Sequence, residues 1–97
     1  MEEVREKIIA KGILEDYLLT LNAVHAYMLS ENPKLSQIII ERIEKTKENV
    51  EGRELVKRYF EYDISNEELE SIWKGKITEK ELSEGIIQAA TLLNKIN

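Results

Sequence analysis

The chain contains no cysteine, a single proline and no long apolar run. Without cysteine it forms neither a disulfide nor a thiolate metal site, and that absence fits a cytoplasmic protein. Its densest apolar stretch, Ile13 to Leu29, is interrupted by acidic and polar side chains, short of the roughly 20 apolar residues that cross a bilayer. The N-terminus carries glutamates where a signal peptide needs net positive charge. We therefore expect a cytoplasmic location and no membrane partner.

Positive charge is also scarce. The chain carries 14 Lys and Arg against 19 Asp and Glu, for a net charge of −5. Only residues 34–58 are basic on balance, with seven basic and five acidic side chains. Most affinity for nucleic acids comes from basic groups that replace phosphate counterions, so we expect no nucleic-acid partner. If one does bind, the residues that would contact it are Arg42, Lys45, Lys47, Arg53 and Lys57.

The charged residues that are present follow a bias. Every acid except Asp16 and Asp63 is glutamate, lysine outnumbers arginine, and isoleucine is abundant. Heat-adapted proteomes share this preference, which favours a thermostable protein from a hyperthermophilic archaeon or one of its viruses. Mesophiles with AT-rich genomes favour the same residues, so that interpretation stays open.

Apolar side chains recur at helical spacing almost throughout the chain, and almost no strand pattern is present. At 97 residues the length suits one domain with a modest core. We therefore predict a single all-α domain over residues 1–97, a compact bundle of about five helices. A long N-terminal hairpin, with its two helices meeting near Asn32, is followed by three shorter helices. The expected helices run over about 2–30, from 33 to a stop at Gly52, and over about 53–62, 66–74 and 79–96.

A helix start occurs twice in the C-terminal half. In each copy a Ser or Thr can cap a helix, a Glu three residues later can reach back to the cap, and flanking apolar residues form a staple. Gly75 stands between the copies and predicts a tight corner. The copies are Ile64-Ser65-Asn66-Glu67-Glu68-Leu69 and Ile77-Thr78-Glu79-Lys80-Glu81-Leu82.

A short corner of this kind also occurs in helix-turn-helix proteins that read DNA. A small nucleic-acid-associated regulatory protein is therefore the alternative function. The carboxylates at the start of the last helix oppose it, because they would face phosphates; they are Glu79, Glu81 and Glu84.

The first expected helix is apolar nearly all round. One side carries a broad stripe through Tyr17 and Leu21, and the opposite side carries further apolar residues, beginning with Leu19. Such a helix needs burial on two sides, so it is either central to the fold or in contact with a second subunit. Whether it bends at Gly12 stays open. The side opposite the core stripe is formed by Leu19, Ala23, Ala26 and Tyr27.

Aromatic residues cluster near the middle of the chain. At helical spacing we assign Phe60 and Trp73 to the core. Tyr27 and Tyr62 are harder to bury within one chain, and tyrosine is enriched at protein interfaces. The predicted partner contacts are therefore Leu19, Ala23, Ala26, Tyr27 and Tyr62.

Chemistry-bearing residues are few. The only histidine, His25, falls in the apolar arc of the first helix, which favours a structural role. The helix carrying Glu41, Glu44 and Glu48 interleaves them with cations, as on a solvated surface. The four glycines are isolated, so no phosphate-binding loop is present, whereas Gly85 favours close packing of the last helix.

We therefore expect a non-enzymatic protein-protein interaction module that self-associates, most simply as a dimer. We assign it no catalytic residue, no cofactor and no metal. A bundle enzyme or metal carrier is a third hypothesis.

Overall fold

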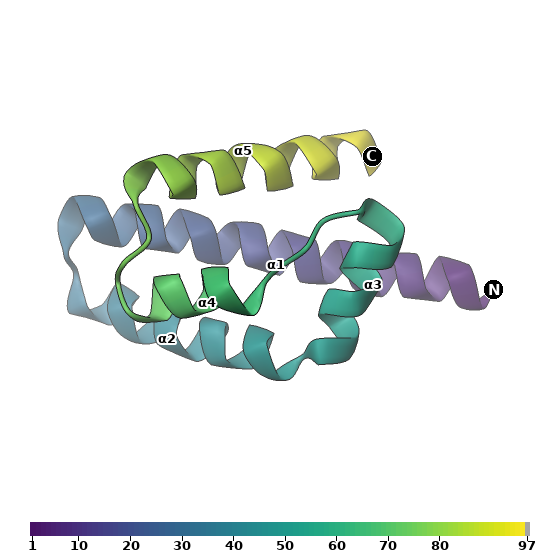
Figure 1. Cartoon of the computed structure of the whole chain (residues 1–97), viewed down its shortest axis with the longest axis horizontal. Coiled ribbons are helices and arrows are strands. Elements are labelled where there is room, and N and C mark those ends of the chain that lie inside the picture. The colour runs from purple at the N-terminus through teal and green to yellow at the C-terminus, as the bar shows by residue number, and fades with distance from the viewer. Residues whose placement is uncertain (97) are drawn as a thin grey trace.

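Five helices make up the fold, seen in a computed structural model that describes residues 1–96 (Figure 1). Over those residues no strand is present, which confirms the predicted all-α bundle of about five helices. The molecule measures 44 × 25 × 21 Å along its principal axes. The helices are α1 (Glu2–Ser30), α2 (Pro33–Glu48), α3 (Val50–Phe60), α4 (Asn66–Trp73) and α5 (Glu79–Ile96).

Helix α1 runs the length of the molecule without a break at Gly12. It has 29 residues, which at 1.5 Å each span about 43 Å. It ends where Glu31 adopts a left-handed conformation, with φ 53°, and donates its backbone N–H to the Tyr27 carbonyl. The Asn32 side chain then accepts from the Lys34 N–H and starts α2. The predicted antiparallel hairpin of α1 and α2 is thus present (Figure 1).

The break between α2 and α3 lies earlier than predicted. Helix α2 ends at Glu48, and the Asn49 side chain caps α3 by accepting from the Gly52 N–H at 2.9 Å. Gly52 is not a helix stop; it is buried in the first turn of α3, where an added Cβ would come 2.5 Å from the Asn49 side chain. Glycine is needed at this position because the Asn49 side chain, which caps the helix, lies too close to the backbone for a larger residue. Val50 accordingly opens α3 and is exposed, not part of the apolar face of α2.

Both predicted helix starts in the C-terminal half are formed. The Ser65 hydroxyl accepts from the Glu68 N–H at 3.1 Å. At α5 the box is reciprocal: the Thr78 hydroxyl accepts from the Glu81 N–H, and the Glu81 carboxylate accepts from the Thr78 N–H, each at 3.1 Å. Gly75 turns the corner with φ 68°. The staple residues Ile64, Leu69, Ile77 and Leu82 are all buried.

The core forms around one side of α1, against which α2, α3 and α5 pack, while α4 packs on α2. Leu14, Tyr17 and Leu21 supply its centre and are at most 1% exposed. Gly85 of α5 is buried against α1, where an added Cβ would lie 3.4 Å from Leu21 Cδ1. The last helix therefore approaches α1 closely at this glycine.

Trp73 corrects one prediction. It was assigned to the core, yet it is 42% exposed, because it is the last residue of an eight-residue helix and lies at the open end of the α4–α5 corner. Its neighbour Ile72 takes the buried position. Phe60 is partly buried and packs against the core.

Candidate interaction surface

Helix α1 has a second apolar side that is largely exposed in the described part of the chain. We call it the outer face, formed by Val4, Ile8, Gly12, Leu19, Ala23 and Ala26. Its large side chains are Ile8, Val4 and Leu19, which are 67%, 59% and 58% exposed. In Figure 1 this helix crosses the middle of the view, between α5 and α4 and behind the segment that joins α3 to α4.

The outer face is exposed because the helices that pack against α1 contact its other side. Helices α2, α3 and α5 pack against α1, and all three contribute to the core around Leu14, Tyr17 and Leu21. On a helical wheel those three residues lie opposite Leu19. The three helices that pack against α1 therefore cover its inner side and leave the outer face exposed.

The predicted contact residues on α1 do not share one environment. Leu19 and Ala26 are exposed, and Ala23 is partly buried against the edge of the core. Tyr27 is also partly buried, and its ring helps line a separate cavity at the end of α1. The structure therefore brings Leu19, Ala23 and Ala26 together and directs Tyr27 elsewhere.

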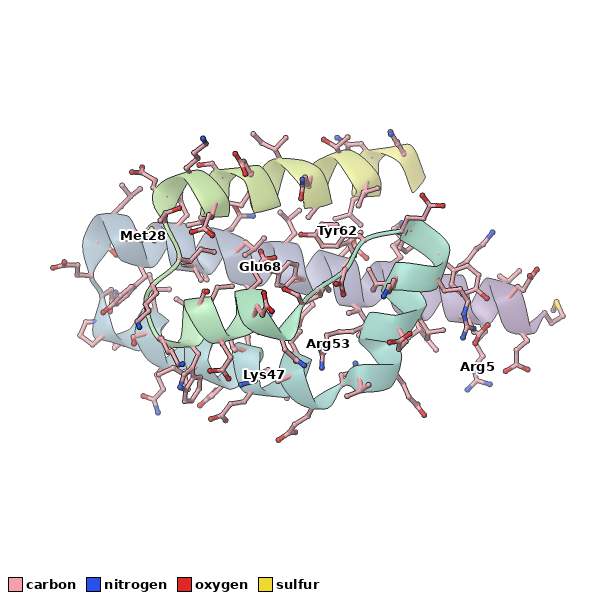
Figure 2. The ribbon with its side chains drawn as sticks, viewed as in Figure 1. Arg5, Met28, Lys47, Arg53, Tyr62 and Glu68 are labelled. Atoms are coloured by element: carbon pink, nitrogen blue, oxygen red, sulfur yellow. The ribbon has the colours of Figure 1, made fainter. Side chains whose placement is uncertain are left out.

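Tyr62 lies on the opposite side of α1 from Leu19. It belongs to the segment between α3 and α4 and packs against Tyr17, with ring centroids 6.3 Å apart and ring planes at 52°. Burial, with a smaller contribution from the Glu68 carboxylate, raises the pKa of Tyr62 to about 12. Figure 2 shows Tyr62 and Glu68 on the side of α1 that faces α4 and α5. Tyr62 therefore lies at an edge of the core, away from Leu19, and its contact with a partner stays a prediction.

The buried hydroxyl of Tyr17 faces an acidic region. Burial is the largest cause that raises its pKa far above the usual range, followed by the charge of the nearby Glu68 carboxylate and a hydrogen bond to it. Glu68 also lines a cavity of about 350 Å³ between α4 and α5, together with Glu81 and Glu84. Glu81 is used in the helix cap, where hydrogen bonds from Thr78 hold the pKa of its carboxyl below the usual range. These acids thus lie where two helix N-termini favour negative charge.

A second cavity, of about 280 Å³, opens at the end of the bundle where α1, α2 and the Gly75 corner meet. Tyr27, Met28, Ile40 and Trp73 line it, and the last three are exposed. These residues come from three different helices. This cavity could not be predicted from the sequence, because no local spacing connects these residues.

Most of the candidate nucleic-acid contacts are engaged within the chain. Arg42 pairs with Asp16 of α1 at 2.6 Å, and Lys47 pairs with Glu70 of α4. Arg53 donates to three acceptors around the start of α3 and of α4, and thereby ties these segments together (Figure 2). Lys45 and Lys57 are exposed. The acceptors of Arg53 are the Ile64 carbonyl, the Asn66 side chain and the Lys47 carbonyl.

The remaining candidates lie apart from one another. His25 is partly buried on α1, whereas Glu41, Glu44 and Glu48 are exposed on α2. Within residues 1–96, no three His, Cys, Asp or Glu side chains are arranged to hold a metal ion.

Two exposed residues of the outer face, Val4 and Ile8, were not among the predicted partner contacts. Their spacing of four residues, continued by Gly12, was the available signal.

Comparison of the chain with family models, with curated proteins and with solved structures finds no match. None of the helices in the described part of the chain is long and apolar enough to cross a membrane.

Proposed function

We propose that the protein is a non-enzymatic helical interaction module that self-associates as a dimer through the outer face of α1. The observation that carries this proposal is the line of exposed apolar side chains along a single helix, from Val4 through Ile8 to Leu19. Large exposed apolar patches are uncommon on soluble monomers and mark interaction sites. Full burial of one such side chain contributes about 1.5–3 kcal/mol.

The shape of the outer face supports a helix as the partner. Gly12, Ala23 and Ala26 are small, so a second helix could approach the α1 backbone closely between the larger residues. Three charged side chains, Arg5, Glu15 and Asp16, interrupt the apolar residues along this face, and all three are exposed. A partner would therefore have to leave them hydrated or pair them, because burial of an unpaired charge costs free energy.

The non-enzymatic part of the proposal rests on where the reactive side chains are used. His25 is partly buried on α1, and Glu81 is committed to a helix cap. The alternative, a helix-turn-helix nucleic-acid protein, is supported less well. Its basic set would have to give up the ion pair of Arg42, the ion pair of Lys47 and the hydrogen bonds of Arg53.

The proposal is tested by replacing one exposed leucine with a charge. Leu19→Glu should abolish the dimer while the protein stays folded, because Leu19 lies outside the core. The matched control is Ile87→Glu, since Ile87 is equally exposed but lies on α5. Size-exclusion chromatography with light scattering over a concentration series gives the mass, and circular dichroism confirms folding. A wild-type protein that stays monomeric at high concentration would refute the proposal.

A further inference from the structure

We propose that the cavity at the end of the bundle, which we call the end cavity, binds a small amphipathic anion: an apolar chain of about eight carbons with a carboxylate head. The end cavity has a volume of about 280 Å³ and is bounded by α1, α2 and the corner between α4 and α5. Figure 2 shows Met28, one of its lining residues, beside that corner. No residue of the outer face lines it, so this site is independent of the proposed dimer.

The floor of the end cavity is apolar and already built. It is formed by Ile39, Ile72 and Ile77, together with Val24 of α1, and all four are at most 7% exposed. A water molecule takes up about 30 Å³ of liquid, so a cavity of about 280 Å³ has room for about nine groups the size of a methylene. Ligand pockets are mostly apolar and carry a few polar groups that fix orientation. The floor therefore suits the alkyl chain of a small amphiphile.

The rim of the end cavity keeps large apolar side chains in contact with water. Met28, Ile40 and Trp73 line the cavity, and all three are exposed. A chain seated on the floor would cover part of this rim as well. Removal of apolar surface from water favours binding, so the rim adds to the affinity that the floor provides.

Hydrogen bonds hold the corner that forms one wall of the end cavity. The Gly75 N–H donates to the Ile72 carbonyl at 3.1 Å, and the Lys76 N–H donates to the Ser71 carbonyl at 2.8 Å. Gly75 itself has φ 68°, a conformation that glycine adopts without strain. The wall is thus fixed before a ligand binds, and a preformed site loses less entropy on binding.

Among the described residues, one ionised side chain lines the end cavity, and it is a cation. Lys74 is 58% exposed and lies 3.8 Å from the Glu70 carboxylate. That carboxylate also pairs with Lys47. One negative charge is therefore shared between two lysines, which leaves a net positive charge beside the cavity. A carboxylate head at the rim complements this charge, and no acidic side chain within residues 1–96 lines the cavity to repel it.

Matched eight-carbon probes test the proposal on the wild-type protein. Trp73 is the only tryptophan of the chain and lines the cavity, so its fluorescence reports binding. Octanoate should give a saturable change and bind more tightly than octanol, which lacks the charge, or octylammonium, whose charge has the opposite sign. Hexanoate should bind about tenfold more weakly than octanoate, because it lacks two methylenes that the floor buries. Isothermal titration calorimetry measures the same constants without the fluorophore.

A pair of charge insertions on α2 tests the location of the site. Ile40→Glu places a carboxylate on the rim and should weaken octanoate binding more than about tenfold, since like charges repel. Ile38→Glu is the matched control, because Ile38 is also exposed on α2 but does not line the cavity. This control should bind octanoate as the wild type does. Circular dichroism confirms that both variants fold.

Replacement of the lysine tests the contact with the head group. Lys74→Gln should weaken octanoate binding about two- to fivefold, the size expected of an exposed ion pair, and should leave octanol binding unchanged. Lys76→Gln is the control, since Lys76 is exposed two residues away and does not line the cavity.

Three results would overturn the proposal. One is the lack of any saturable change at millimolar octanoate, which would leave the rim as a contact for a protein side chain. Another is equal octanoate binding by Ile40→Glu and Ile38→Glu, which would place the ligand elsewhere. The third is equal binding of octanoate, octanol and octylammonium, because the site would then not select an anion.

Discussion

The two sides of α1 carry similar residues but differ in how far these residues are buried. On the inner side Leu14 and Leu21 are fully buried, whereas on the outer side Ile8 and Leu19 are more than half exposed. Hydrophobicity does not separate them, because both sides are built from aliphatic residues. What separates the two sides is the packing of neighbouring helices, since α2, α3 and α5 contact only one side of α1. An apolar pattern thus shows which residues gain from burial, but not which molecule buries them.

The largest effect is expected from a matched pair of leucine truncations, one on each side of α1. Leu21→Ala should cost about 2–5 kcal/mol of unfolding free energy, because it leaves a cavity in the core. Leu19→Ala should change the stability of the monomer by no more than about 0.5 kcal/mol. Urea unfolding at low protein concentration measures both. Equal losses at the two positions would show that the outer face is buried within the same chain.

A pair of glycine substitutions sharpens the comparison. Gly85→Leu should destabilise the fold by about 1–3 kcal/mol, since the side chain would overpack the contact with Leu21. Gly12→Ala, on the outer face, should stabilise the monomer by up to about 1 kcal/mol, because alanine favours the helix and meets nothing there. Thermal unfolding gives the order of the variants. A destabilised Gly12→Ala monomer would reveal an intrachain contact at the outer face.

The smallest effect is expected away from both sides of α1, at the cap of α5. Hydrogen bonds from Thr78 lower the pKa of the Glu81 carboxyl in the folded state. A group of this kind adds stability above its unfolded pKa and loses it as the pH falls through the folded pKa. The melting temperature of the wild type should therefore exceed that of Glu81→Gln at neutral pH. This difference in melting temperature should disappear below about pH 4. Glu44→Gln, at an exposed site on α2, is the control and should show no such pH-dependent gap.

Local signals predicted the helices well. The ends of α4 and α5 were placed closely because Ser65 and Thr78 bring their own hydrogen-bond partners within three residues. The prediction that the second helix ends at Gly52 was wrong for a related reason. Glycine is a frequent helix stop, but here Asn49 already breaks the chain and needs a glycine three residues later to approach its backbone.

Long-range arrangement was harder to foresee. Tyr62 was expected to be hard to bury within one chain, but it packs on Tyr17 because the segment between α3 and α4 returns across α1. Trp73 was predicted in the core, but α4 is too short to cover its own end. Arg53 was considered for phosphate binding, and only the fold shows that backbone and side-chain oxygens from two other segments reach it.

The sequence by itself determined the helices, their caps, the hairpin and the apolar character of both sides of α1, because each of these depends on residues within a few turns of one another. Only the tertiary structure decided that Leu21 is buried while Leu19 is exposed, and that Tyr62 belongs to the core edge. The reason is physical: burial depends on where helices distant in the sequence pack, and α2, α3 and α5 all pack on the inner side of α1.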